Sequence, residues 1–236
     1  MRISGSIRSV GLAVFACVLA GCESQAQQRE SELRELSGFT GIHAGGGIDL
    51  HVLQGADFRV EITEGDPADL VTEVSGTTLE IHPRRGLGGF FNWGAGHEVS
   101  VTLPVLETLR AGGGTDVEVS GEIGGESLQL ASSGGSDIEI RVAVRHLEVD
   151  VSGGSDVDLS GTADSATLKA SGGSDLDAAG FRVRDARVES SGGSDIVIGV
   201  EERLSGSASG GSDIVYSGNP RTVDVDTSGG SDLTRR

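Results

Sequence analysis

Ser152–Leu159 reads SGGSDVDL, and Ser171–Ala178 repeats it as SGGSDLDA. The SGGSD element recurs through the second half of the chain, usually followed by alternating apolar residues, at steps of 19, 19, 20, 18 and 19 residues. Its six aspartates are Asp137, Asp156, Asp175, Asp195, Asp213 and Asp232. A near-constant period of this size is typical of stacked coils, in which each repeat packs on a copy of itself.

The same frame extends towards the N-terminus. Gly112–Val119 (GGGTDVEV) places Asp116 in it, and Gly45–Val52 (GGGIDLHV) places Asp49 in it. The repeat therefore reaches almost from one end of the chain to the other and predicts one domain.

Apolar residues keep register with each aspartate, at nine, seven and five positions before it and one and three after it. For Asp156 these residues are Leu147, Val149, Val151, Val157 and Leu159. This period of two predicts two half-buried strands per repeat, joined by the glycine corner. The repeat length varies only between the strands of successive corners, so residues 160–165 and 179–185 are predicted loops.

We therefore predict an all-β fold, a right-handed parallel β-helix or β-solenoid with coils of about 19–20 residues. Roughly ten coils spaced by about 4.8 Å would give a rod on the order of 50 Å long. The alternative is an antiparallel meander closed into a barrel or sandwich. Identical residues in identical positions favour stacking. Glycine makes up 39 of 236 residues and aromatic residues only 3%, which suits a narrow core.

The N-terminus resembles a bacterial lipoprotein signal. Two arginines flank an apolar stretch that ends in Leu19-Ala20-Gly21-Cys22, which reads as a lipobox. We expect residues 1–21 to be a signal peptide, Cys22 to be lipidated, 22–35 to be a flexible tether and 36–236 to form the solenoid domain. An ordinary secretory signal is the alternative. Glu23 follows the cysteine instead of an inner-membrane retention aspartate, which favours the outer membrane of the cell envelope.

From Leu36 onward the chain resembles the family of the putative autotransporter adhesin head GIN domain. The segments that carry the resemblance are Phe39 with Ile42, IDLHVLQG to Gly55, GTTLEIH to His82 and VTLPVLETL to Leu109, followed by glycine-rich repeats. The resemblance covers roughly the whole mature chain and implies a β-helix-like fold in an exported, often lipid-anchored protein. It implies no catalytic residues. This chain departs from the family in its uniform repeats and in a longer insertion at Arg84–Gly96.

The aspartate column is the sharpest chemical feature. Stacking would bring like carboxylates to about 5 Å, where each pair repels by roughly 1 kcal/mol in a water-like dielectric. One interpretation is structural: the carboxylates face solvent and accept hydrogen bonds from backbone amides and from hydroxyls such as those of Ser136, Ser155 and Ser174. The other is that Asp137, Asp156, Asp175, Asp195, Asp213 and Asp232 collect divalent cations, above all Ca²⁺. No other cofactor is expected.

Aromatic residues are concentrated in RRGLGGFFNWGAGH, which contains Phe90, Phe91 and Trp93. They are expected either to cap the solenoid, or to contact a protein or glycan partner or a bilayer surface.

Signals of an enzyme are missing. The histidines stand singly, and the predicted mature chain keeps no free thiol. The net charge of −18 disfavours nucleic acid and favours basic surfaces. We predict a non-enzymatic envelope lipoprotein, a binding, scaffolding or adhesin-like module and a monomer. The alternatives are a Ca²⁺-stabilised structural protein and a carbohydrate-active β-helix enzyme, which needs two carboxylates in unlike settings.

Overall fold

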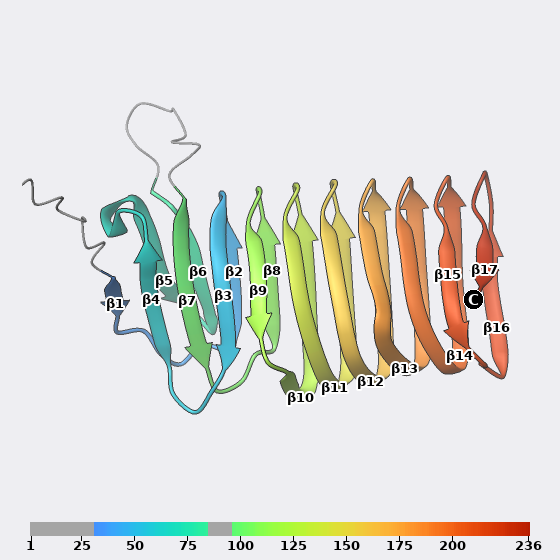
Figure 1. The fold of residues 1–236 in the computed structure, drawn as a ribbon, viewed down its shortest axis with the longest axis horizontal. Coiled ribbons are helices and arrows are strands. Elements are labelled where there is room, and N and C mark those ends of the chain that lie inside the picture. The colour runs from blue at the N-terminus through green and yellow to red at the C-terminus, as the bar shows by residue number, and fades with distance from the viewer. Residues whose placement is uncertain (1–30, 85–95) are drawn as a thin grey trace, which may run out of the picture.

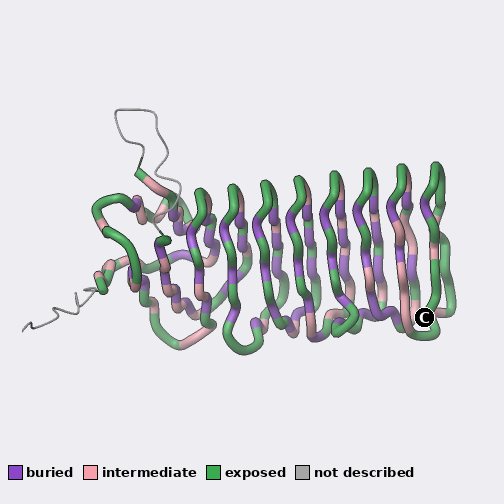
Figure 2. Tube along the Cα trace, turned by 45° about the horizontal axis from the view of Figure 1, so that its top comes forward, coloured by how far each residue is buried: buried purple, intermediate pink, exposed green. Residues whose placement is uncertain are grey.

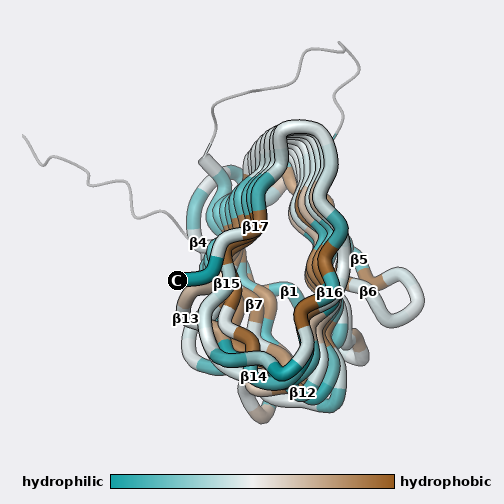
Figure 3. The backbone as a smooth tube through the Cα atoms, turned by 90° about the vertical axis from the view of Figure 1, so that its right-hand side faces the viewer, coloured by the Kyte–Doolittle hydropathy of each residue, from teal (hydrophilic) through white to brown (hydrophobic). Residues whose placement is uncertain are grey.

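The computed structural model describes residues 31–84 and 96–236. Strands account for 73% of the chain and helix for 2%, in a β-solenoid of about seven turns with coils of about 19 residues (Figure 1). The predicted fold class and coil length are confirmed. Viewed along the long axis, successive coils superpose (Figure 3). No helix among the described residues is long and apolar enough to cross a membrane.

Ten strands form the part of the solenoid that we call the repeats. They are β8 (Thr108–Gly112), β9 (Asp116–Ser120), β10 (Ile123–Ser133), β11 (Asp137–Ser152), β12 (Asp156–Gly172), β13 (Asp175–Gly192), β14 (Asp195–Gly210), β15 (Ile214–Gly218), β16 (Thr222–Thr227) and β17 (Leu233–Arg235). All their pairings with one another are parallel. The antiparallel meander is therefore wrong for this region.

The register follows the aspartates, as the period predicts. Asp137 pairs with Asp156, Asp156 with Asp175, and Asp175 with Asp195. Each corner is turned by glycine in the left-handed region, for example Gly153 with φ of 73°, where a side chain would be strained. Buried and exposed residues alternate between the corners (Figure 2), so the core is a thin column of aliphatic side chains.

The predicted loops at residues 160–165 and 179–185 are wrong. Both segments lie inside continuous strands, β12 and β13. The chain bends there while its backbone remains paired with the coil next to it, and extra residues are absorbed as irregularities such as the one between Asp158 and Ser160. Bulges of this kind bend a strand without ending its pairing.

The first coil consists of β2 (Gly41–Gly45) and β3 (Ile48–Gln54). It does not lie at the end of the stack, because β2 pairs with both β6 and β8, and β3 with both β7 and β9. The chain thus leaves the first coil, builds a further layer on its outer side, and returns beneath it to begin the repeats (Figure 1).

That outer layer, with β1, is the N-terminal cap. Its elements are β1 (Glu32–Arg34), β4 (Arg59–Glu64), a 3₁₀ turn (Pro67–Asp69), β5 (Leu70–Ser75), β6 (Thr78–Pro83) and β7 (His97–Leu103). Within it β4 runs antiparallel to β7, and β5 antiparallel to β6. Residues 55–107 therefore contribute only the coil β6–β7, which explains why the solenoid has about seven turns instead of ten.

Two contacts fix the cap and the crossing of the chain. The rings of Phe39 and Phe58 meet at 5.0 Å between centroids under the cap. Gln54 donates from Nε2 to the carbonyls of Pro104 (3.0 Å) and Gly124 (3.1 Å), and its Oε1 accepts from the Gly124 amide at 2.8 Å. One side chain thus joins the end of β3 to the returning segment and to β10.

The folded chain begins earlier than expected. Glu32–Arg34 pairs antiparallel with β4, with Leu33 opposite Glu61, although the sequence places it in the tether. Its backbone hydrogen bonds to β4 hold it in place. The predicted signal peptide and lipidated Cys22 lie outside the described residues.

Candidate functional site: an acidic face on the solenoid

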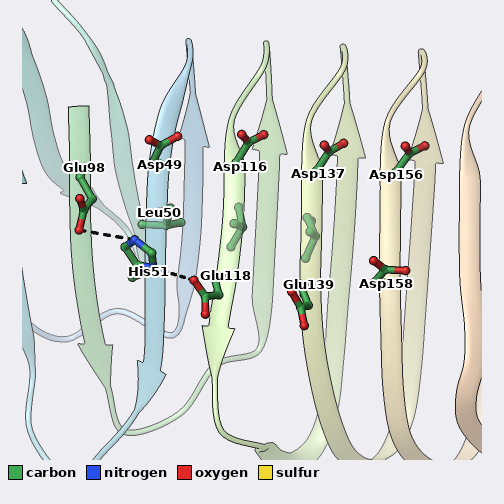
Figure 4. A pocket seen from close by; sticks show the side chains of 12 residues that line it. Asp49, Leu50, His51, Glu98, Asp116, Glu118, Asp137, Glu139, Asp156 and Asp158 are labelled. Carbon is green, nitrogen blue, oxygen red and sulfur yellow. Dashed lines mark ion pairs between the residues drawn. The ribbon is translucent and has the colours of Figure 1, made fainter. Parts of the chain in front are cut away.

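One outer surface of the solenoid is lined by two parallel files of carboxylates, which we call the acidic face. The Asp file contains Glu98, Asp49, Asp116, Asp137, Asp156, Asp175, Asp195, Asp213 and Asp232, and the lower file contains Glu118, Glu139, Asp158 and Asp177. Figure 4 shows the end near the cap, where the two files flank a shallow open groove of about 570 Å³.

The alternation within each strand produces this surface. In β9, Val117 and Val119 are buried while Asp116 and Glu118 face solvent. Since parallel pairing keeps the register, outward residues of successive coils align in files along the axis. Within the described strands no lysine or arginine stands in either file, so the face is uniformly acidic apart from His51.

The Asp file is stabilised by hydrogen bonds that run from coil to coil. The amide of Asp213 donates to Oδ1 of Asp195 at 3.0 Å, and that of Asp232 donates to Oδ1 of Asp213 at 3.0 Å. The contact from Asp175 to Asp156 is longer, at 3.4 Å. Each of these carboxylates therefore accepts a backbone amide from the next coil, which offsets part of the repulsion between like charges.

The serine hydroxyls do not serve the carboxylates, as the sequence suggested. Ser136, Ser155 and Ser174 are fully buried on the inner side of the corner. The Ser155 hydroxyl accepts from the Ser136 amide at 3.1 Å, and the Ser174 hydroxyl donates to the Ser171 carbonyl at 2.6 Å. These serines satisfy backbone groups inside the corner, because the residue before each aspartate points inward.

Asp116 is the carboxyl whose environment is most unfavourable to charge. Partial burial, together with the negative charges of Asp137 and Asp49 on either side, raises its pKa, and the amide of Asp137 opposes the shift. The file is therefore less uniform than identical residues in every coil would suggest. Asp116 lies where the first coil meets the repeats.

His51 interrupts the lower file near the cap. Its Nε2 lies 3.5 Å from Oε1 of Glu98, and its Nδ1 lies 3.4 Å from Oε2 of Glu118 (Figure 4). These are ion pairs when the ring is protonated. His43, on the other sheet of the same coil, pairs with Glu80 at 2.8 Å.

The described part of the chain holds no group of three or more histidine, cysteine, aspartate or glutamate side chains that could bind a metal ion. Asp137, Asp156, Asp175, Asp195, Asp213 and Asp232 form a single file, as predicted. A cation there would meet carboxylates from one side only, whereas Ca²⁺ takes six to eight oxygen ligands. This geometry suits diffuse counterions better than chelation.

Other predicted features are placed differently. Phe90, Phe91 and Trp93 lie outside the described residues, within the segment that joins β6 to β7. No aromatic residue is among the described residues that line the groove. The aromatic platform that the carbohydrate-enzyme hypothesis requires is thus not found beside the carboxylates in this part of the chain.

Sequence reasoning missed the lower file and the place of Glu98. A signal for both exists, because HEVSV in β7 and DVEVS in β9 share the spacing of DLHVL in β3. Aligning the acidic residue of each segment would have put Glu98 in the Asp file and Glu118 beside His51.

Comparison with known proteins supports the fold. The family model described as "Putative auto-transporter adhesin, head GIN domain" matches residues 38–220. Comparison with curated proteins finds no match to this chain.

Three solved structures share the architecture. A putative adhesin from Bacteroides fragilis is 21% identical with a TM-score of 0.77, covering 88% of this chain and 96% of its own. A putative lipid binding protein from Parabacteroides distasonis is 19% identical with a TM-score of 0.71, covering 89% and 98%. A putative adhesin from Parabacteroides merdae is 14% identical with a TM-score of 0.65, covering 89% and 97%. At these identities the likeness concerns the fold alone.

Proposed function

Because this chain belongs to the putative auto-transporter adhesin, head GIN domain family, we propose that it is an adhesin-like, non-catalytic binding module of the cell envelope that engages cationic surfaces through its acidic face. The observation that carries this proposal is the continuity of the two carboxylate files. A long surface of one sign attracts oppositely charged partners and raises their association rate.

The rigidity of the scaffold supports the same proposal. The aspartates stand on strands that are paired on both sides from β3 to β14, and their neighbours one position along are buried aliphatic residues. Carboxylates held in this way lose little conformational freedom on binding. The face can therefore engage a partner at several points at once.

A charge-matched pair of variants tests the proposal. The face variant carries Glu118→Gln, Glu139→Gln, Asp158→Asn and Asp177→Asn. The control variant removes the same charge from the other sheet with Glu148→Gln, Asp150→Asn, Asp224→Asn and Asp226→Asn, residues that are exposed there. The probe is a synthetic ten-residue lysine peptide, with its fully acetylated form as the uncharged probe.

We expect the wild-type chain to bind the lysine peptide in a salt-dependent manner, because exposed charges are screened within about 8 Å at physiological ionic strength. The face variant should bind about fivefold more weakly, the equivalent of about 1 kcal/mol, while the control variant binds as the wild type does. Equal weakening in both variants would show that only net charge matters and would refute a defined contact face.

We also propose that Cys22 is the lipid anchor, on the support of the Leu19-Ala20-Gly21-Cys22 motif. Expression with an alkyne-tagged fatty acid should label the wild-type chain and leave Cys22→Ser unlabelled and released from the membrane fraction. Glu23 after the cysteine supports the outer membrane, which density-gradient separation of the two membranes tests. Labelling that persists in Cys22→Ser would reject this anchor.

Phe90, Phe91 and Trp93 are proposed as an additional contact, since their segment leads directly into β7, the strand that carries Glu98. Replacing all three with serine should weaken attachment to envelope material and leave the melting temperature unchanged. A lowered melting temperature with normal attachment would support capping in its place.

A further inference from the structure

His51 occupies a boundary between two parts of the fold. It lies on β3, which pairs on one side with β7 of the N-terminal cap and on the other with β9 of the repeats. Its ring is 39% exposed, and its two nitrogens point to Glu98 on β7 and Glu118 on β9 (Figure 4). One side chain therefore spans the junction.

The chemistry of this arrangement depends on a proton. A neutral imidazole carries one N–H and one lone pair, so one of its nitrogens must turn a lone pair towards a carboxylate. An imidazolium has an N–H on each nitrogen and attracts both glutamates. Only the protonated ring can satisfy the two sides of the junction together.

The surrounding charges all favour the proton. The groups nearest His51 are Glu98 on β7, Asp49 on its own strand, and Asp116 and Glu118 on β9. No basic side chain lines this groove in the described part of the chain. An imidazolium here meets acidic groups on every packed element and also relieves their mutual repulsion.

His43 provides a built-in contrast on the opposite sheet of the same coil. Its Nδ1 lies 2.8 Å from Oε2 of Glu80 on β6, but its register partner on β8 is Arg110. A proton on His43 would thus face an acid on one side and a permanent cation on the other. Only His51 is placed between two acids.

We infer that His51 is a proton-dependent clasp that ties the N-terminal cap to the repeats. The clasp holds at pH 5.5, below the ordinary titration of histidine near pH 6.5, where the glutamates are still ionised. It is lost as the pH rises to 8, because the ring becomes neutral and the two ion pairs disappear. The cap is then held by its backbone pairing and apolar contacts alone.

Amide hydrogen exchange of the purified full-length chain tests this inference. Protection factors, corrected for the intrinsic exchange rate at each pH, are measured at pH 5.5 and 8.0 for β7 and, as an internal reference, for β12. We expect β7 to be roughly threefold better protected at pH 5.5, in keeping with the small energies of half-exposed ion pairs. The reference amides should show no such change.

The variants separate the clasp from simple packing. His51→Gln should abolish the pH effect on β7, His43→Gln should retain it, and Glu118→Gln, which keeps His51 in place, should reduce it. An equal pH effect in the wild type and His51→Gln would overturn the inference. So would a loss of protection in His51→Gln that is the same at both pH values, since that outcome indicates packing.

Discussion

In the repeats every strand pairs in parallel with the strand one coil away, whereas in the N-terminal cap β4 and β5 run antiparallel to β7 and β6. Both regions bury aliphatic side chains, for example Leu168 in the repeats and Leu70 in the cap. What differs is how pairing is specified. A repeat finds its partner about 19 residues away, and the cap finds its partners across 20 to 50.

This difference has a physical consequence for the two regions. In a stack of like coils each layer contacts only its neighbours, so stability is close to a sum of local terms. The cap closes the N-terminal edge, which would otherwise expose unpaired backbone groups. It does so with specific contacts such as Gln54, and not with a repeated pattern.

The largest expected difference between the regions concerns glycine. Gly161 in β12 has φ of 108°, and a Cβ there would collide with the backbone carbonyl of Val142 in the neighbouring coil. Gly161→Ala should therefore lower the free energy of unfolding by about 3 kcal/mol or more. Gly76, in the cap hairpin, has φ of 62° and nothing within 4 Å, so Gly76→Ala should cost only about 1 kcal/mol. Urea unfolding of both variants measures the contrast, and equal losses would contradict it.

The next effect concerns the crossing of the chain. Gln54→Ala removes three hydrogen bonds and leaves the Gly124 amide without its partner, which should cost about 2 kcal/mol. Gln129→Ala is the matched control, because that side chain is exposed on β10. Thermal unfolding followed by circular dichroism compares them. A Gln54→Ala variant as stable as Gln129→Ala would show that the crossing does not depend on this side chain.

The sequence predicted the repeats well because their information is local. Asp156 and Asp175 repeat in register, and their alternating neighbours identify the inner side of each strand. Pairing that lies far apart in sequence could not be read in this way. Asp49 stacks on Asp116, 67 residues later, because the whole cap is inserted between them.

The site was predicted in part for the same reason. The Asp file follows from the period, but the role of its amides and the inward turn of Ser155 depend on corner geometry. The environment of His51 depends on two strands whose adjacency no repeat announces. The predicted loops failed because a bent strand and a loop leave the same variation in repeat length.

A smaller effect concerns charge at the junction. Since the pKa of Asp116 is raised in the folded chain, the folded state holds this proton to higher pH than the unfolded state, and ionisation at neutral pH costs stability. Asp116→Asn should be more stable than the wild type at pH 7 by about 0.5 kcal/mol or less, after allowance for solvent screening. The gain should vanish as the pH falls through the folded pKa.

Asp150→Asn is the control for this measurement. Its register neighbours are Ala131 and Lys169, so removing the charge removes attraction instead of repulsion. Urea midpoints at pH 7 and pH 3 give the comparison. A stabilisation by Asp116→Asn that is unchanged at pH 3 would mean that it does not come from the carboxylate charge.

The smallest expected effect is that of calcium. The Asp file offers carboxylates from one side, without a third ligand group among the described residues, so calcium should screen the file and not be chelated by it. Millimolar CaCl₂ should raise the melting temperature no more than the same concentration of MgCl₂. A selective rise with calcium, reversed by a chelator, would revive the calcium hypothesis for Asp137 to Asp232.

Disulfide trapping tests most directly whether the cap is an insertion that leaves the Asp file continuous. In a background with both native cysteines replaced by serine, Asp49→Cys with Asp116→Cys places two thiols on paired neighbouring strands, a separation that a disulfide can bridge. The account predicts rapid cross-linking of this pair on mild oxidation and none for Asp49→Cys with Asp69→Cys, the partner that uninterrupted stacking by about 20 residues would supply. Cross-linking of the second pair and not the first would contradict it.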